Sequence, residues 1–461
     1  MHRLVHRHLL LPAFETVLKR RNTLRYWKDL EATQWMPSAV LAEQQHRALV
    51  QLAAHAYSHC PFYRDAWNAA GLHPRQLTSP GDFRAWPVID RDTIRAHRAA
   101  MRATNQERPL LTKSTGGSSG VPLQFDLDHN SHERRTAAAH RGYGWAGAAP
   151  GTKQLYLWGS AIGDQSRRIR WKDALYHMLQ RRRVVSCFDA DRLAQGLAQG
   201  LAERFVSELG AYRPDAIVAY TNPLYEVALR LEESGQSPAY APRTIVVGAE
   251  KLHSFQRIVI ERVFRAPVFE TYGSREFMLI GAECEHHRGL HITAEQLLVE
   301  VLDDEGEHVQ DGTEGNVVIT DLWNYGMPFV RYATGDRATV GDTPCCCGRG
   351  LPLLTSVAGR RLDMLIGSGG RTIPGEFFPH LVKDFPAVRR YQVVQEAPDR
   401  VRFMLAADGM TASDRAKLEQ LVRAALGTGV HVDFEPVAHI PLTAAGKLQV
   451  VINRMPLRRA G

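Results

Sequence analysis

A loop of small and hydroxyl-bearing residues is the first place where the sequence indicates chemistry. The segment 114–122 reads STGGSSGVP, in which glycines alternate with hydroxyls: Thr115, Gly116, Gly117, Ser118, Ser119 and Gly120. Glycine permits tight turns, so backbone N–H groups and hydroxyls in such a loop can face phosphate oxygens. The loop is not a Walker A motif, because no Gly-Lys-Ser/Thr follows. It predicts a phosphate-binding loop of another type, with a plain surface loop as the alternative.

Three later motifs carry charged side chains of the kinds that bind a nucleotide. Glu276, in the segment 272–276 after an expected strand, could bind a divalent cation there, and Tyr272 could stack on a base. Asp336 ends RYATGD and could accept two hydrogen bonds from a ribose. Lys447, in PLTAAGK, could place a positive charge where negative charge develops during attack. Each motif is weak evidence alone, whereas the four in this order are specific.

Two cysteine- and histidine-rich segments have the composition of a metal site. Cys284 precedes His286, His287 and His291, and a second segment holds the triplet 345–347. Four such ligands would form a closed tetrahedral zinc site of the structural kind. The alternative is a group of reduced, unliganded thiols.

The elements expected to position these residues alternate between strand and helix in the middle of the chain. Short apolar runs predict strands at 154–158, 216–220, 244–248 and 268–272, with helices at 224–233 and 254–264 between them. Ser254 is expected to be the N-cap of the second helix. This alternation predicts a parallel sheet with right-handed crossovers. Upstream, 38–72 reads as largely helical, with Pro61 ending the helix and a loop-rich stretch following to about residue 108.

The pattern changes twice towards the C-terminus. Near residue 296 two strands flank a polar turn, which predicts an antiparallel or barrel-like subdomain. From about residue 360, strands and a helix at 413–425 form a small α+β unit. We therefore expect an α/β protein with a large domain, 1–359, and a small mobile α+β domain, 360–461.

Composition excludes several classes of protein. The 461 residues are 44% hydrophobic and carry a net charge of +8, without a nucleic-acid-binding signature. We interpret the basic runs as solvated faces or anion contacts. No run reaches the ~20 apolar residues of a membrane span, and the N-terminus does not read as an export signal. A reducing cytoplasm is the expected location.

The whole set of motifs resembles the adenylate-forming superfamily, which includes acyl-CoA synthetases, luciferases and nonribosomal adenylation domains. It is most similar to phenylacetate–CoA ligases and their capsule-polysaccharide-biosynthesis relatives. Besides the four motifs, the resemblance rests on segments spread over nearly the whole chain: HAYSHCPFYRDAW (55–67), VGAEKL (247–252), GLHI (289–292) and GRRLDMLI (359–366).

The resemblance implies a role for each matching residue. The glycines and hydroxyls of 115–120 would hold ATP phosphates, and Glu250, Tyr272, Gly273 and Ser274 would border the adenine and acyl pocket. Glu276 would bind Mg²⁺, Asp336 and Arg360 the ribose, and Lys447 would catalyse adenylation. The zinc set would be Cys284, His291, Cys345 and Cys347, with His286 or His287 as alternatives to His291. Two positions depart from the family, Leu123 after the loop and Leu362 at the expected hinge.

The resemblance also implies the reaction. A carboxylic acid and ATP would give acyl-AMP, and the acyl group would pass to a thiol, expected to be that of coenzyme A. Two alternatives stay open: transfer to a carrier protein, amine or hydroxyl in a biosynthetic pathway, and a non-catalytic scaffold in surface-polysaccharide synthesis. Relatives form dimers, so a homodimer is a further expectation.

Overall fold

The structure is a computed structural model of the chain. It describes most residues from 6 to 455: 6–115, 123–159, 177–187, 201–341, 344–358, 365–368, 372–373, 375, 377–382, 384–385, 387–407, 409–427, 429–438, 440 and 450–455.

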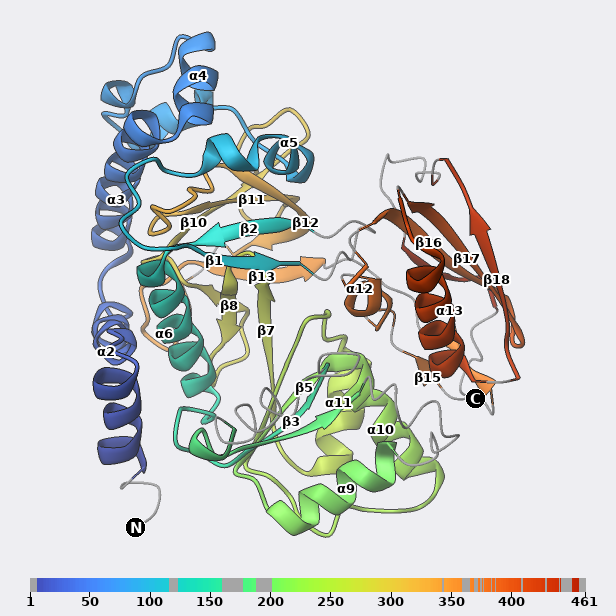
Figure 1. Cartoon of the computed structure of the whole chain (residues 1–461). Helices are drawn as coiled ribbons and strands as arrows, with labels where there is room; N and C mark the ends of the chain where they lie inside the picture. The colour runs from blue at the N-terminus through green and yellow to red at the C-terminus, as the bar shows by residue number, and fades with distance from the viewer. Residues whose placement is uncertain are drawn as a thin grey trace.

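An eleven-stranded mixed sheet organises the large part of the molecule (Figure 1). Five of its strands are parallel, in the spatial order β4-β3-β5-β6-β7: β3 (Gln154–Trp158), β4 (Arg182–Ser186), β5 (Ala216–Tyr220), β6 (Thr244–Gly248) and β7 (Val268–Ser274). Four of these are the strands that the sequence predicts. β5 and β6 are buried along their whole length, as apolar runs of parallel strands should be.

The antiparallel strands continue the same sheet from β7. They follow in the spatial order β8-β9-β13-β12-β11-β10, with these bounds: β8 (Met278–Glu283), β9 (Leu290–Ile292), β10 (Leu297–Leu302), β11 (Glu314–Asp321), β12 (Tyr332–Val340) and β13 (Leu353–Ala358). The two strands expected around a polar turn are β10 and β11, which pair antiparallel. The sequence suggested a separate barrel-like subdomain, whereas these strands share one sheet with the parallel ones, in which β10 and β4 are the outer strands.

Three helices cover the parallel strands: α9 (Leu201–Tyr212), α10 (Thr221–Glu233) and α11 (Ser254–Phe264). Their apolar faces pack on β3, β5 and β6 through side chains such as Phe205, Leu224 and Phe264, all fully buried. The N-cap of α11 is His253 rather than the predicted Ser254. His253 and Gln256 form the reciprocal capping box that would otherwise need Ser or Thr.

The N-terminal region is more helical than the sequence suggests. It runs through η1 (His6–Leu10), η2 (Ala13–Leu18), α2 (Thr23–Thr33), α3 (Ser38–His59), α4 (Pro61–Ala69), η3 (Pro74–Gln76), η4 (Pro80–Ala85) and α5 (Arg91–Met101). Pro61 not only follows α3 but also starts α4, where its missing N–H costs nothing. α5 was expected to be loop. Asp90 caps it by accepting the Thr93 N–H, although its apolar positions are few.

A hairpin and one long helix connect this region to the sheet. The hairpin is β1 (Leu111–Ser114) and β2 (Gln124–Leu127), and the helix is α6 (His129–Trp145). α6 packs along β8 and against α2 (Figure 1). Asp128 caps α6 through the Ser131 N–H and also accepts the backbone N–H groups of Tyr325 and Gly326. The hairpin and the loop after β11 are thereby joined at one carboxylate.

A four-stranded sheet with two helices forms the C-terminal unit. Its elements are β14 (Leu365–Ile366), β15 (Thr372–Ile373), α12 (Phe377–Val382), β16 (Val388–Ala397), β17 (Arg400–Ala407), α13 (Ala412–Leu426), β18 (His431–Pro436) and β19 (Val451–Asn453). The strand order is β18-β17-β16-β19, and the helix predicted at 413–425 is α13. The unit has its own apolar core, to which Tyr220 at the end of β5 contributes. These separate sheets support the division at 359/360, which stays a prediction because 359–364 lie outside the described residues.

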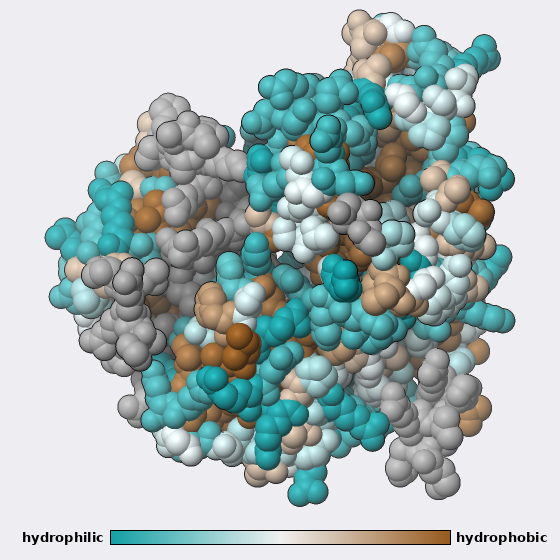
Figure 2. Space-filling model, turned by 180° about the vertical axis from the view of Figure 1, so that it is seen from behind, coloured by the Kyte–Doolittle hydropathy of each residue, from teal (hydrophilic) through white to brown (hydrophobic). Residues whose placement is uncertain are grey.

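Two features describe the apolar character of the helices and of the surface. Over the described part of the chain, no helix has both the length and the apolar character needed to cross a bilayer. The face seen in Figure 2 is mixed, with hydrophobic residues gathered in small separate patches.

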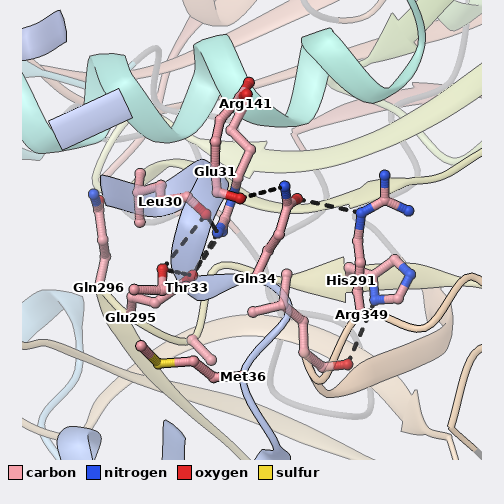
Figure 3. A network of polar contacts seen from close by, with 12 residues as sticks. Leu30, Glu31, Thr33, Gln34, Met36, Arg141, His291, Glu295, Gln296 and Arg349 are labelled. Carbon is pink, nitrogen blue, oxygen red and sulfur yellow. Dashed lines mark hydrogen bonds and ion pairs between the residues drawn. The ribbon is translucent and has the colours of Figure 1, made fainter. Parts of the chain in front are cut away.

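The end of α2 is clamped against the loop that follows Cys347 (Figure 3). The Gln34 side chain accepts hydrogen bonds from Trp145 Nε1 (2.8 Å) and Arg349 Nε (3.2 Å), and the Gln34 carbonyl accepts the Gly350 N–H (2.9 Å). Gly350 lies so close that a Cβ there would sit 1.8 Å from the Met36 carbonyl oxygen. Only glycine therefore permits this contact between segments some 315 residues apart.

Gly350→Ala should lower the free energy of unfolding by about 2 kcal/mol, because the new methyl group pushes the two backbones apart. Chemical denaturation measures the change. Gly210→Ala is the matched control, since Gly210 lies in α9 with nothing within 4 Å of the added Cβ. Equal unfolding midpoints for the two variants would contradict the clamp.

Candidate functional site

The turn after β7 depends on a glycine. A Cβ at Gly273 would lie 2.0 Å from the Met278 carbonyl oxygen, and the pairing of β7 with β8 shifts register between Tyr272 and Gly273. The shift is an irregularity of the kind that re-aims side chains at the end of a strand. Ser274 continues the turn by accepting the Phe277 N–H on its hydroxyl (3.2 Å). This turn delivers Glu276 to the edge of the sheet where the parallel strands end.

Glu276 is a carboxylate held almost out of water, 5% exposed. Its Oε1 accepts hydrogen bonds from Arg91 Nη2 (3.3 Å) and the Tyr332 hydroxyl (3.4 Å). Its backbone carbonyl accepts from Arg135, which is also ion-paired with Asp321. Among the described residues, all side-chain contacts recorded for Glu276 go to Oε1. Oε2 is therefore free of described partners, and a carboxylate oxygen is a ligand that Mg²⁺ prefers.

Tyr272 and Asp336 meet across the sheet. The Tyr272 hydroxyl donates to Asp336 Oδ2 (2.9 Å), and the Asp336 N–H donates to Thr334 Oγ1 (3.1 Å). Tyr332, four residues before Asp336 on β12, contacts Glu276. Two contacts therefore tie the TYGSRE and RYATGD segments together. Three residues from two separate motifs, Tyr272, Glu276 and Asp336, are thereby linked through β12, whereas their roles stay predictions.

The described ends of the candidate phosphate loop form a closed base. The Thr115 N–H donates to the Leu123 carbonyl, and the Leu123 N–H donates to Thr115 Oγ1, each at 2.9 Å. Leu123, which departs from the family pattern, is 1% exposed and packs in the core. The buried Leu123 side chain therefore fixes the C-terminal end of the loop to the hydrophobic core. Gly116, Gly117, Ser118, Ser119 and Gly120 lie outside the described residues.

Asp126, which the sequence reading missed, anchors the hairpin that carries this loop. The carboxylate is fully buried and accepts from Arg98 (2.7 and 2.9 Å), Arg102 (2.8 Å) and Thr112 (2.6 Å). Burial of an ionised carboxylate is tolerated only with such partners. The sequence held no signal for this site, because Arg98 lies on α5 and Arg102 directly follows it, in a stretch that was expected to be loop.

Glu250 has a structural contact that its motif does not reveal. Its carboxylate accepts the backbone N–H of Asn222 (2.7 Å) and the Asn222 amide (2.6 Å), in the first turn of α10. A carboxylate there satisfies an unpaired helix N–H and suits the helix dipole. Glu250 thus fixes the loop after β6 against α10, at the border where the pocket is expected.

Four side chains of metal-ligating types, the set that the resemblance implies for zinc, lie together in the structure. The ligand atoms of Cys284, His291, Cys345 and Cys347 all lie within 4.8 Å of one another. Cys284 and Cys345 sulfurs are 3.7 Å apart, and Cys347 Sγ lies 3.3 Å from His291 Nε2. His291 Nδ1 faces the Leu351 carbonyl (3.4 Å), which fixes the ring with Nε2 towards the thiols. His286 and His287 are not in this group.

The electrostatics of the cluster fit a metal. Burial lowers the pKa of His291 to about 4, so the imidazole stays neutral at physiological pH, as a metal ligand must. Burial raises the pKa of the Cys284 thiol to about 12. The Arg349 N–H, near Cys347 Sγ, counteracts burial and holds the Cys347 pKa below its usual value. A bound cation would favour thiolates at all three cysteines.

Besides the five loop residues, two further predicted site residues lie outside the residues that the structure describes. These are Arg360 and Lys447, together with Leu362 at the expected hinge. Their assignments stay predictions.

Glu270 titrates near neutrality and makes a testable contribution to stability. It accepts the Leu252 N–H (2.9 Å) beside Glu283, and burial raises its pKa from 4.5 to about 7. The folded state therefore binds the Glu270 proton more tightly than the unfolded state does. The stabilisation that this proton gives the folded state is lost as pH rises from about 4.5 to about 7. Between pH 5 and pH 8, wild type should lose about 2 kcal/mol more than Glu270→Gln, measured by denaturation. Parallel pH profiles would contradict this.

Sequence comparison finds relatives along nearly the whole chain. Residues 365–454 match the CapK C-terminal domain. A phenylacetate–coenzyme A ligase from Thermus thermophilus is 25% identical over 459 residues, covering 93% of this chain and 99% of the relative. Protein CapK from Staphylococcus aureus is 22% identical, covering 95% and 94%.

A solved structure shows the same fold. It is 2-hydroxyisobutyryl-CoA ligase in complex with its acyl-AMP and CoA in the thioesterification state. The TM-score is 0.63 at 21% identity, covering 92% of each chain. These similarities to phenylacetate–CoA ligases and to Protein CapK, together with the shared fold, support the classification that the sequence motifs suggest, that of a phenylacetate–CoA ligase-like or CapK-type adenylate-forming protein.

Proposed function

We propose that the protein is an AMP-forming ligase that activates a carboxylic acid as acyl-AMP and passes the acyl group to coenzyme A. Two observations carry this proposal. Tyr272 contacts Asp336, and Tyr332, on the same strand as Asp336, contacts Glu276. The described ends of the candidate phosphate loop, Thr115 and Leu123, are hydrogen-bonded to each other. The relatives named as phenylacetate–coenzyme A ligases support the same reaction.

The nucleotide would lie across this edge. Asp336, positioned by the hydrogen bond from the Tyr272 hydroxyl, would accept ribose hydroxyls on its carboxylate, and Arg360 would assist. Tyr272, Gly273, Ser274 and Glu250 would border the adenine and acyl group. The segment 115–120 would surround the phosphates with N–H and hydroxyl donors.

Glu276 and Lys447 would stabilise the negative charge that develops when the carboxylate oxygen of the acid attacks the α-phosphorus of ATP and pyrophosphate leaves. A magnesium ion bound by Glu276 would neutralise phosphate oxygens. Lys447 would place its ammonium beside the attacking carboxylate and the α-phosphate. The remaining contribution is positioning, because two reactants held in contact no longer lose translational freedom at the transition state.

Acid-dependent ATP–pyrophosphate exchange tests this proposal. A panel of aryl, fatty and hydroxy acids, with and without coenzyme A, should identify one acid that supports exchange. Glu276→Gln, Asp336→Asn and Lys447→Ala should each lower the exchange rate ~100-fold or more, since each removes a charge that acts on the nucleotide. Glu208→Gln, on an exposed ion pair with Arg183, is the control and should match wild type.

The outcomes separate the alternatives. AMP release that depends on coenzyme A supports the ligase, whereas release that depends only on a carrier protein, amine or hydroxyl supports a biosynthetic acyl transfer. No exchange with any acid, together with no ATP binding, would favour a non-catalytic scaffold.

We further propose that Cys284, His291, Cys345 and Cys347 hold a structural zinc ion. Three thiols and one imidazole within tetrahedral reach form a closed donor set, and their burial leaves no evident position for a substrate. The site would join the end of β8, β9 and the loop after β12. The same loop contacts the end of α2 through Arg349 and Gln34.

Metal analysis tests the zinc site. The purified protein should contain about one zinc per chain, and Cys284→Ser and Cys345→Ser should lose it and unfold at lower temperature. Cys346→Ser is the matched control, because Cys346 is exposed and stands between two ligands without joining them. Zinc-free wild type, or equal zinc loss in the control, would refute the assignment.

We also propose that the protein is cytoplasmic and that it forms a homodimer. Fractionation of cells and the mass of the purified protein in solution would test them directly.

A further inference from the structure

The segment from Ile89 to Arg102 contacts three parts of the candidate site. Ile89 pairs with β12, donating its N–H to the Arg331 carbonyl (2.9 Å) and accepting the Ala333 N–H (2.8 Å). Arg98 and Arg102 bind the carboxylate of Asp126, on the β2 strand that follows the candidate phosphate loop in the chain. Arg91, at the first turn of the same helix, reaches Glu276. α5 thus places one guanidinium inside the site while its other arginines fix the helix to the hairpin.

Arg91 and Glu276 form an ion pair that is largely removed from water. Their side chains are 16% and 7% exposed, and Arg91 Nη2 lies 3.3 Å from Oε1. Solvent and salt screen such a pair poorly, so the charge of Arg91 acts on whatever approaches the carboxylate. The Tyr332 hydroxyl contacts the same oxygen, which leaves Oε2 for a ligand.

The charge of Arg91 affects two possible ligands in opposite directions. A free divalent cation carries +2 and is repelled by a guanidinium a few ångströms away. The complex of that cation with ATP carries about −2, so the same guanidinium attracts it. We propose that Arg91 is a positioning residue that makes the site select metal–nucleotide over free metal. It neutralises Glu276 until the complex arrives. This inference rests on the proposed role of Glu276 as the metal ligand.

Binding measurements test the inference without relying on turnover. Manganese is added in steps to the zinc-loaded full-length protein, first as the free ion and then as its complex with a non-hydrolysable ATP analogue. Electron paramagnetic resonance measures how much manganese is bound at each step. The titrations use wild type, Arg91→Met, Arg91→Gln and Arg91→Lys, and Glu276→Gln defines binding at other sites.

The two ligands should respond in opposite directions. Arg91→Met should bind free manganese ~10-fold more tightly than wild type and the manganese–nucleotide complex ~10-fold more weakly, because one nearby positive charge is gone. Arg91→Gln should behave the same way if the methionine variant does not fold. Arg91→Lys keeps the charge and should restore both affinities towards wild type.

A merely structural role gives a different pattern. Loss of both affinities together in the neutral variants, or unchanged affinity for free manganese, would overturn the proposal. If Glu276→Gln binds the manganese–nucleotide complex like wild type, the assignment of Glu276 fails and the Arg91 inference fails with it. The acid-dependent exchange assay remains an independent test of the ligase reaction.

Discussion

Arg135 is the side chain on which the rest of the site depends. It is 3% exposed, and its guanidinium donates to the Glu276 carbonyl and to Asp321. A buried guanidinium must be fully paired, because leaving one partner out exposes a charge to a medium that cannot solvate it. One residue therefore fixes α6, the end of β11 and the turn after β7 relative to one another. The position of the Glu276 carboxylate follows from this, and Tyr332 and Tyr272 then bind the turn to β12.

Much of this site could be predicted from the sequence because its residues lie in short motifs at strand ends. The strands β3, β5, β6 and β7 were readable as apolar runs, and the resemblance named the three cysteines and the histidine that the structure brings together. The structure adds contacts that have no local signature. Glu250 caps a helix almost thirty residues away, and Asp126 depends on arginines of α5, whose apolar positions are too few to reveal a helix.

The N-terminal segment shows the same limit more strongly. Gln34 and Met36 gave no sign that they would contact Arg349 and Gly350, because the contact consists of backbone groups and one hydrogen bond between an amide and a guanidinium. The contact is possible because Gly350 has no side chain. The sequence alone does not distinguish a glycine that permits a close backbone contact from any other glycine. The capping of α11 by His253 is a smaller case, in which histidine takes a role that propensities give to serine.

β7 has a mechanical consequence. Its first half pairs in parallel with β6 and its second half antiparallel with β8, so one strand transmits force between the two halves of the sheet. Hydrogen-bonded strands shear with difficulty, and the register of a buried strand cannot slip by one residue without turning its apolar face outward. The parallel and antiparallel strands of the large unit are therefore expected to move together as one rigid sheet. If the proposed small domain moves between chemical steps, the movement should fall in the chain after β13, the last strand of this sheet in sequence, and the strands that carry Tyr272 and Asp336 should keep their arrangement.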